Sequence, residues 1–344
     1  ISLMINPEEE AARTIMNTLK FPNAESVDTF FSNRANMLEL LIEKGSQLAG
    51  MKLKNLNSGL KDKVIICIVE RGKDIMVPTG DFILEEDDVI YVTGTNDAVA
   101  NFYDRMGYKK NKDINSVMLI GGGTLSHYLL GKLIKRKKQV KVIEEVRETA
   151  KKLSNNYLNA IVVRGDETDQ ELLLNEGIEK YDAVIAATDN DEENMVISMF
   201  AKSVNSGKII TQMNRTLLLP ILEKYEFSTP IVPKKVISDI IIRVVRSKMN
   251  AKGSKMNAKG SKMNTLHRFG DNRVEAMVFE INEKSKSIGV PLKDLPILSE
   301  VIIAGILRRE ELTYPGGNDT IEVNDKVMII TTRKGVEDFD DILG

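Results

Sequence analysis

A glycine-rich turn and a later acid are the residues whose types and spacing could do chemistry. In "IGGGTLS", Gly121 and Gly123 follow an apolar run and precede a helical pattern. Glycines at this spacing permit a tight turn and let the backbone approach a diphosphate. Glu144 ends the next apolar run, where an acid can bind ribose hydroxyls. The pattern predicts a dinucleotide site, and the acid favours NAD over NADP because it repels a 2′-phosphate.

Polar residues follow two later strand-like runs of the same region. The third position of the glycine fingerprint is Ser126, which is small enough to pack but is not glycine. Gly165 and Asp166 close the third predicted strand, where an adenine or ribose edge would lie, and residues 188–191 (TDND) follow the fourth. The side chains of residues 188–191 either contact the ligand or only cap the next helix, and both interpretations stay open.

Residues typical of catalysis or of metal binding are scarce. His127 lies on the first turn after the glycines, and His267 lies beside a lysine-rich repeat. Neither has a positioned acid beside it. Cys67 lies inside an apolar strand-like run, which indicates a buried and inert thiol. No pair of Cys or His has metal-ligand spacing. We therefore expect no catalytic residue and no metal site.

The pattern around the glycines alternates between strand and helix. Five apolar runs, beginning with "VMLIG" and ending with "KIITQ" before Asn214, are separated by helical patterns. This alternation predicts an α/β fold with a doubly wound, parallel, Rossmann-like sheet over residues 114–240. The ligand crevice of such a sheet lies at the carboxyl ends of its strands.

A small β-rich module occurs twice. Residues 37–56 match 277–295, and residues 64–92 match 301–330, with Pro78 and Gly80 on Pro315 and Gly317. In this alignment Asp87 falls on Asp325 after a one-residue insertion. We assign the modules to residues 33–108 and 273–344.

The first α/β half is expected to be largely missing. The opening "ISLMIN" resembles "KIITQMN", so residues 1–25 read as the last strand and crossover helix of a first unit. Residues 217–227 are a candidate for the second crossover helix or, equally, a core helix. Residues 247–264 contain the direct repeat "SKMNAKG" and read as a basic linker, because this composition buries little apolar surface.

Composition excludes several classes of protein. The 344 residues carry 48 basic and 50 acidic side chains, so a broad nucleic-acid surface is not expected. The longest apolar runs are too short to span a bilayer. The single cysteine excludes a disulfide scaffold and fits a reducing cytosol.

The glycine turn, "VKVIEE", the segment 162–195 and the duplicated modules resemble the regulatory proteins of the Trk/Ktr potassium-uptake systems, most closely those of the TrkA type with tandem RCK (KTN) units. The resemblance implies a cytoplasmic, non-enzymatic protein that binds NAD(H), and often ATP or ADP. It further implies a homo-oligomeric ring, expected to be a tetramer, on the inner face of the membrane. There the ring would gate a TrkH/KtrB-like potassium channel or transporter.

The ligand site combines the residues carried over from this family with their neighbours at the same strand ends. The family's basic residues after the ribose acid are replaced by Glu145 and Thr149, with Arg147 displaced, so the choice between NAD(H) and adenine nucleotides stays open. The predicted cofactor-binding residues are Gly121, Gly123, Thr124, Leu125, Glu144, Glu145, Gly165, Asp166, Thr188, Asp189 and Asp191.

Other functions remain as alternatives. An NAD-dependent oxidoreductase would need a catalytic residue in the missing segment. A regulatory domain of a cation–proton antiporter, or β modules that bind another small molecule such as a cyclic dinucleotide, would share most of these features. Glycine turns alone do not separate these functions, because the same fold serves many of them.

Overall fold

The computed structural model describes residues 6–31, 34–58, 63–108, 113–205, 207–225, 228–238, 241, 260–269 and 273–344. The chain divides into two compact units. Unit 1 combines Ile1–Pro22 with Asn111–Ser238, and unit 2 combines Asn23–Lys110 with Asp239–Gly344. Each unit is therefore built from two segments that are far apart in the sequence.

Unit 1 contains a six-stranded sheet in the order β11-β10-β9-β6-β7-β8. All neighbouring strands are parallel. Successive strands are added on one side of β6 up to β8 and on its other side from β9 onward, so the strand order reverses between β6 and β9. This confirms the predicted doubly wound sheet. Its strands are β6 (Ser116–Ile120), β7 (Gln139–Glu144), β8 (Ala160–Arg164), β9 (Ala183–Ala186), β10 (Lys208–Gln212) and β11 (Thr229–Ile231).

Helices cover both faces of this sheet because successive strand residues point to opposite sides. Leu119 and Ile185 enter one core with the helices α1, α3 and α4. Met118 and Val184 enter the other core with α5 and α6. The bounds of these elements are α1 (Pro7–Lys20), α3 (Thr124–Lys135), α4 (Arg147–Asn156), α5 (Gln170–Asn175), η2 (Ile178–Lys180) and α6 (Asp191–Val204).

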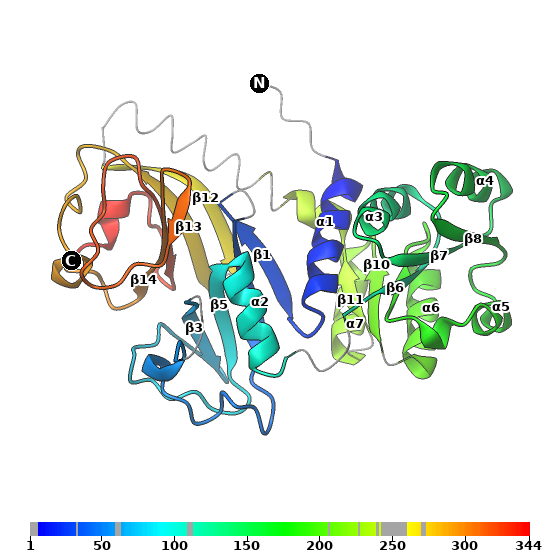
Figure 1. Ribbon diagram of the computed structural model, residues 1–344, viewed down its shortest axis with the longest axis horizontal. Coiled ribbons are helices and arrows are strands. Elements are labelled where there is room, and N and C mark those ends of the chain that lie inside the picture. Colours follow the sequence, from blue (N-terminus) through cyan, green and yellow to red (C-terminus); the bar gives the residue numbers. More distant parts are fainter. Residues whose placement is uncertain are drawn as a thin grey trace. The chain divides into compact units, whose positions relative to one another are not determined.

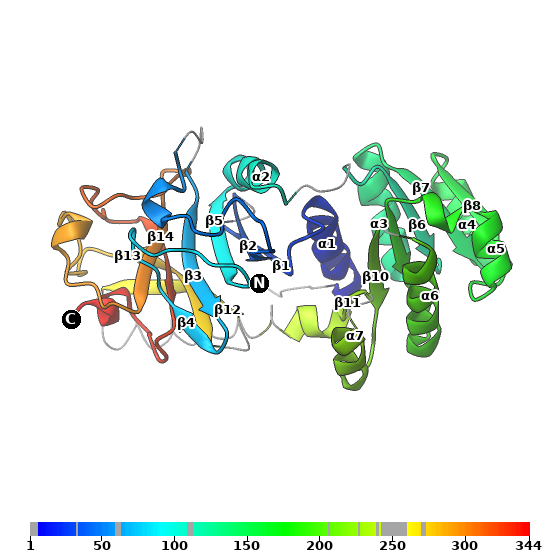
Figure 2. The same ribbon diagram turned by 90° about the horizontal axis from the view of Figure 1, so that it is seen from below.

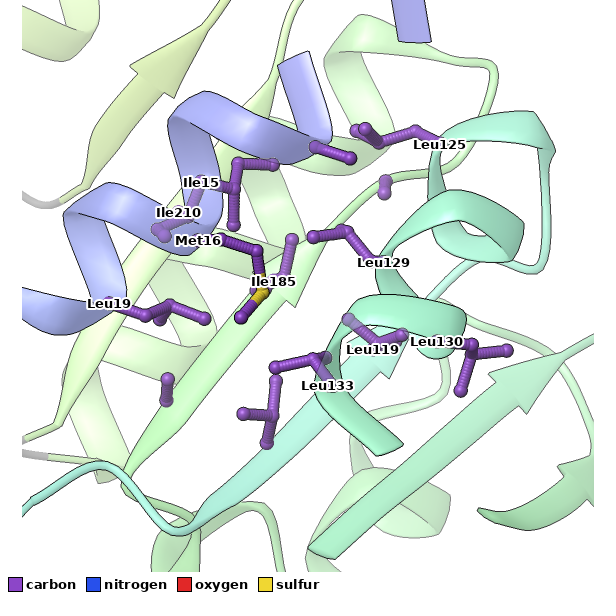
Figure 3. Close-up of a cluster of buried hydrophobic side chains, with 14 of the residues drawn as sticks. Ile15, Met16, Leu19, Leu119, Leu125, Leu129, Leu130, Leu133, Ile185 and Ile210 are labelled. Carbon is purple, nitrogen blue, oxygen red and sulfur yellow. The ribbon is translucent and has the colours of Figure 1, made fainter. Parts of the chain in front are cut away.

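Helix α1 shares its core with α3, as Figure 3 shows for Ile15 and Leu129. The side chain of Asn6 caps α1 by accepting from the Glu9 N–H, and Pro7 supplies a preset φ at the first helical position. Fully burying a side chain such as Ile15 stabilises the packing by about 2 kcal/mol. A helix was expected in this segment, whereas the strand expected before it lies outside the described residues except for Asn6.

The interpretation of residues 217–227 as a crossover helix is wrong. Helix α7 (Leu219–Tyr225), preceded by η3 (Thr216–Leu218), connects β10 with the adjacent strand β11. Leu222 of α7 lies in a buried cluster with Met213 and Val232, so α7 is a core helix of this sheet. Helical conformation resumes at Pro233, directly after β11. That segment, which begins with proline as α1 does, is the counterpart of α1.

Unit 2 contains two five-stranded antiparallel sheets, seen beside each other in Figures 1 and 2, with the orders β1-β2-β5-β3-β4 and β12-β13-β16-β14-β15. The first comprises β1 (Ser26–Phe30), β2 (Ala35–Leu41), β3 (Ile65–Arg71), β4 (Asp74–Met76) and β5 (Val89–Thr95), with η1 (Leu53–Asn55) and α2 (Asn96–Arg105). The second comprises β12 (Ser261–Phe269), β13 (Val274–Ile281), β14 (Val301–Arg308), β15 (Glu311–Thr313) and β16 (Lys326–Thr331), with η4 (Leu292–Asp294) and η5 (Phe339–Ile342).

The two sheets confirm the predicted β-rich repeat down to their bulges. The register of β3 shifts between Ile66 and Ile68, and that of β14 shifts between Ile303 and Gly305. The hairpins also correspond, because Val69 pairs with Met76 as Ile306 pairs with Thr313. The second sheet therefore repeats the first with a constant spacing through this region.

This constant spacing corrects the predicted one-residue insertion. Arg71 donates from Nε and Nη2 to the buried carboxylate of Asp88, at 2.7 and 2.8 Å. Arg308 holds the buried Asp325 in the same way, at 2.9 and 2.7 Å. Asp88 is thus the counterpart of Asp325. Asp87, which the alignment had placed there, adopts a left-handed φ of +65° in the preceding turn.

The last copy of the SKMN repeat is not linker. Ser261 opens β12, and both its backbone N–H and its hydroxyl donate to Asp338 at 3.0 Å. Met263 enters the core of the second sheet. Tertiary contacts thus place residues 261–264 in a strand despite their composition. The earlier part of the predicted linker, residues 247–259, lies outside the described residues.

The faces of the two sheets share one apolar core. Phe30 and Tyr91 of the first sheet pack in the same buried cluster as Val278 and Met328 of the second. Two reciprocal contacts flank this core. Arg34 donates to the backbone oxygen of Glu310 at 2.7 Å, and Arg273 donates to that of Lys73 at 3.2 Å. The modules are therefore paired with approximate twofold symmetry.

Among the described residues, none of the helices has both the length and the apolar character needed to cross a bilayer.

The buried carboxylate of each module predicts a clear stability effect. Asp325→Ala leaves the Arg308 guanidinium without its main partner and the Glu322 N–H without its acceptor. We expect the free energy of unfolding to fall by about 3 kcal/mol, measured by chemical denaturation. The control is Glu322→Ala, which removes only the solvent-exposed partner of Arg308 and should cost less than about 1 kcal/mol. Equal losses in the two variants would contradict this account.

Candidate functional site

The turn that follows β6 can accept only glycine at its first position. Gly121 has a φ of +101°, a left-handed conformation that side chains disfavour. A Cβ at this residue would lie 2.4 Å from the carbonyl oxygen of Ala187, which follows the adjacent strand β9. The Gly121 N–H donates to Ile143 of β7 at 2.9 Å. The glycine therefore lets the chain turn between two strands that leave no room for a side chain.

The middle glycine was not among the predicted site residues, yet it holds the ribose acid in place. The N–H of Gly122 donates to Oε2 of Glu144 at 2.7 Å, and the N–H of Val146 donates to Oε1 at 2.6 Å. A Cβ on Gly122 would collide with Oε2 at 2.4 Å. Glu144 is only 5% exposed, so its carboxylate has a fixed position. Each oxygen retains a further lone pair with which it could accept from a ribose hydroxyl.

The third glycine leaves the space beside the helix open. At Gly123 the φ is −64°, and a Cβ would find no atom nearer than Oδ1 of Asp189, at 3.7 Å. Gly123 is the N-cap of α3 but supplies no capping side chain. The first N–H groups of α3, at Thr124 and Leu125, can therefore receive an anion at the positive end of the helix dipole. This backbone fits a diphosphate, and Leu125 can take part only through its N–H because its side chain is in the core.

Ser126 replaces the third glycine of the fingerprint without opening the packing. Its side chain is fully buried, and its hydroxyl donates to the carbonyl oxygen of Gly121. A glycine could not make this bond. The serine thus ties the first turn of α3 to the start of the glycine turn, and the turn keeps its shape.

The end of β9 faces the glycine turn across the reversal point of the sheet. Thr188 is held by Asn194, whose Oδ1 accepts from the Thr188 N–H at 2.8 Å. Asn190 caps α6 by accepting from the N–H groups of Glu192 and Glu193. The capping interpretation is therefore correct for Asn190. Asp189 is exposed and is the polar group nearest to the open side of the turn.

Asp191 has a different surrounding from its neighbours. It is 3% exposed and accepts from the N–H groups of Asn214 and Arg215, at 2.8 and 2.9 Å, and from Nε of Arg215 at 3.1 Å. Burial acts to raise the pKa of Asp191, but these hydrogen bonds outweigh it and the pKa is lowered. The carboxylate thus fastens the start of α6 to the loop after β10.

The residues after β8 form a local turn. Asp166 accepts from the hydroxyl and the N–H of Thr168, at 2.7 and 2.8 Å, and these bonds lower its pKa. Gly165 has no space for a side chain, because a Cβ would lie 2.4 Å from Leu172. Glu145, the residue after the ribose acid, is exposed. Among the predicted acids, Glu144 alone is bonded directly to the glycine turn.

A further acid at this end of the sheet was missed in the sequence. Oε1 of Glu167 lies 3.4 Å from the N–H of Glu145. Burial, and then the negative charge of Glu144, raise the pKa of Glu167 to about 7, with smaller contributions from Glu145 and Glu193. The signal available in the sequence was its place directly after the predicted contact Asp166.

The imidazole and thiol groups have surroundings typical of structural residues. His127 contacts Tyr157, with Nδ1 3.1 Å from the phenol oxygen. His267 is 7% exposed, packs on Phe30 in unit 2, and has Nδ1 3.4 Å from Oδ1 of Asp28. The expectation that neither histidine has an acid beside it is therefore wrong for His267. Cys67 is fully buried, and burial raises its pKa. In the part of the chain that the structure describes, no cluster of three or more His, Cys, Asp or Glu could hold a metal ion.

The glycines predict stability losses of different size. Gly121→Ala places a methyl group against Ala187 in a strained conformation, so we expect the free energy of unfolding to fall by about 3 kcal/mol. Gly123→Ala meets open space and has an ordinary φ, so it should cost no more than about 1 kcal/mol. Thermal unfolding of the two variants measures the difference. Similar losses would show that the turn is not constrained as described.

Glu167 predicts a pH effect. Its folded pKa is raised from 4.5 to about 7, so folding favours the protonated acid. Its contribution to stability is therefore fully present below pH 4.5 and is lost as the pH rises through about 7. Relative to the wild type, Glu167→Gln should be stabilised at pH 8 and should show a flatter dependence between these limits in thermal unfolding. Glu148→Gln, at an exposed position on α4, should follow the wild type. If Glu167→Gln also follows the wild type, protonation of Glu167 does not contribute to stability in this way.

Comparison with known families agrees with this architecture. Residues 117–233 match the model of the TrkA-N domain, and residues 37–107 and 276–344 match that of the TrkA-C domain. The first match covers the glycine turn and most of the parallel sheet. The other two fall on the two antiparallel sheets.

Proteins with related sequences span nearly the whole chain. TrkA homolog 2 of the Trk potassium-uptake system of Methanosarcina mazei is 26% identical over 338 residues, covering 98% of this chain and 72% of the relative. The Trk system potassium uptake protein TrkA of Vibrio alginolyticus is 27% identical over 341 residues, covering 98% and 71%.

Solved structures share the fold. The GsuK RCK domain aligns with a TM-score of 0.50 at 14% identity, covering 95% of this chain and 67% of that one. The GsuK channel bound to NAD aligns with a TM-score of 0.51 at 15% identity, covering 98% and 58%. With a TrkA-N domain between two TrkA-C domains and relatives of this name along its length, the chain belongs to the TrkA family of potassium-uptake proteins.

Proposed function

We propose that this protein is a nucleotide-sensing regulatory subunit of a potassium-uptake system and that it binds NAD(H) in its TrkA-N domain. The observation that carries the proposal is the open backbone at Gly123, which directly follows the glycine whose N–H holds the carboxylate of Glu144. The relatives are named as Trk potassium-uptake proteins, and the GsuK channel of the same fold is described as bound to NAD.

Two parts of the site would hold two parts of the ligand. The N–H groups at Gly123, Thr124 and Leu125 would receive the diphosphate, and Glu144 would receive the ribose hydroxyls. The remaining proposed contacts border the crevice at the ends of β7, β8 and β9. They are Glu145, Gly165, Asp166, Thr188, Asp189 and Asp191. Of these, Asp166 and Asp191 already have internal hydrogen-bond partners.

The charge around the crevice favours NAD(H) over the further candidates ATP and ADP. Glu144 and Glu145 lie at the end of β7, where a nucleotide that carries more phosphate charge would be repelled. Arg147 is exposed at the first position of α4. ATP and ADP are therefore expected to bind more weakly than NADH at this site.

The ligand would act as a signal and would not be converted. The two histidines and the cysteine have the structural roles described above, so the groups that most often transfer protons or act as nucleophiles are engaged elsewhere. A ligand that binds two arrangements of the domains with different affinities shifts their populations. A coupling of about 1–3 kcal/mol between sites is enough for regulation.

The proposed partner is a TrkH/KtrB-like membrane subunit. In this proposal the chains form a homotetrameric ring, cytoplasmic and peripheral on the inner face of the membrane, and the ring gates potassium flow. In this proposal residues 1–25 correspond to the end of a further TrkA-N domain, and helix α1 packs against α3. Movement of that first domain would then be transmitted to the ligand-binding domain.

Binding of the nucleotide can be tested by isothermal titration of the full chain with NADH, NAD, NADPH, ATP and ADP. Glu144→Ala removes the ribose contact, and Gly123→Asp fills the diphosphate cradle with a negative side chain. Each should weaken NADH binding by about tenfold or more, which corresponds to about 1.4 kcal/mol. NADPH should bind more weakly than NADH to the wild type.

The control is Glu148→Ala, which removes an exposed acid from α4 and should bind NADH as the wild type does. Unchanged binding in both Glu144→Ala and Gly123→Asp would refute the proposed site. Steady conversion of NADH with a small substrate would refute the non-enzymatic role.

A further inference from the structure

Phe82 of the first TrkA-C domain corresponds to Asp319 of the second, as their backbone hydrogen bonds show. In the first, the N–H of Phe82 donates to Thr79, and its carbonyl oxygen accepts from Leu53. In the second, the N–H of Asp319 donates to Gly316, and its carbonyl oxygen accepts from Leu292. Asp319 thus occupies the backbone position of Phe82.

This exchange removes an aromatic ring from the face of an arginine. In the first domain the guanidinium of Arg71 lies over the ring of Phe82, 5.0 Å from the ring centre. Arg308 has the same carboxylate partners as Arg71, but an aspartate stands at the ring position. The ring is therefore replaced by a carboxylate, and Arg308 lines a cavity.

The cavity has a volume of about 530 Å³, within the range of small-molecule sites. At three lining positions an apolar residue of the first domain is replaced by a polar one. Met76 is replaced by Thr313, Phe82 by Asp319 and Ile83 by Thr320. A surface that is apolar in one copy is thus polar and hollow in the other.

The hairpin above the cavity holds a strained arginine. Arg309 and Glu310 have φ values of +46° and +71°, whereas the first domain has Gly72 at the position of Arg309. A left-handed conformation costs about 1–2 kcal/mol for a residue with a side chain. Arg34 holds this turn through the backbone oxygen and the carboxylate of Glu310. The turn places Arg309 at the cavity, and such strain is most often retained at functional positions.

Both signs of charge line the cavity. Arg309 supplies a positive group, while Glu311 and Asp319 supply negative groups, and Arg308 is neutralised by Asp325 and Glu322. A cationic or anionic ligand would meet one repulsive partner, whereas a zwitterion can satisfy both. Arg308 still presents its planar face, on which an aromatic ring can stack.

We propose that the second TrkA-C domain binds a free aromatic amino acid. Its ring takes the place that Phe82 fills in the first domain and lies on the guanidinium of Arg308. Its carboxylate pairs with Arg309, and its ammonium group pairs with Asp319 and Glu311. The site lies in the TrkA-C domain and is independent of the nucleotide site.

The test is isothermal titration of the full chain with phenylalanine, tyrosine and tryptophan at concentrations up to about 1 mM, where a complex of about 4 kcal/mol is half formed. At least one should bind. Leucine lacks the ring, phenethylamine lacks the carboxylate and 3-phenylpropionate lacks the ammonium group. Each should bind at least about tenfold more weakly than phenylalanine. Binding of none of the three amino acids, or equal binding of phenylalanine and leucine, overturns the proposal.

Two variants locate the site. Asp319→Phe restores the first domain's ring over Arg308 and should abolish binding. Because it also removes the acceptor of the Gly316 N–H, circular dichroism checks that the variant is folded. Arg309→Gly removes the carboxylate partner and the strain, so it should weaken binding about tenfold and raise the unfolding temperature. Asp81→Ala, in the corresponding loop of the first domain, is the matched control and should leave binding unchanged. Unaltered binding in Asp319→Phe overturns the assignment, and unaltered NADH binding there shows that the nucleotide site is intact.

Discussion

The candidate site depends on the close approach of two strand ends, β6 and β9, at the point where the sheet reverses. The space there is so narrow that a Cβ on Gly121 would overlap the Ala187 carbonyl. Only glycine fits there, and Gly121 also adopts a left-handed φ of +101°. The next N–H, at Gly122, donates to Glu144. Ser126 then ties α3 to the same turn. Each contact of the cradle follows from that one steric limit.

The paired TrkA-C domains illustrate how a duplicated scaffold can diverge. Each copy keeps a buried aspartate gripped by an arginine, because removal of either partner would leave a buried charge uncompensated. The shared core between the sheets adds a second constraint. Surfaces outside these two constraints are free to change, and the surroundings of Arg71 and Arg308 have done so. One copy is closed by an aromatic ring, while the other is polar and open.

Two predictions failed, and one open choice was settled, where local pattern and tertiary context compete. The last SKMN copy is polar enough for a linker, yet Met263 reaches a core and Asp338 holds Ser261. Residues 217–227 have the apolar pattern of a crossover helix, but the strand β11 that follows them joins the same sheet. The alignment of Asp87 with Asp325 was one residue out, because adjacent acids cannot be told apart without knowing which one is buried.

The sequence by itself determined the parallel sheet, the repeated β module, the glycine turn and the acid at the end of β7. These features depend on local periodicity and on residue types that only a few conformations accept. The structure alone decided which acids face the crevice. Asp191 and Asp166 accept hydrogen bonds from neighbouring residues. Glu144 is held by the glycine turn, and Glu167 lies close enough to Glu144 for its pKa to be raised. The open face of Arg308 was also hidden in the sequence, because its meaning depends on a residue in another loop and on the pairing of two hairpins. Side-chain direction is set by packing between distant segments, and no local pattern encodes it.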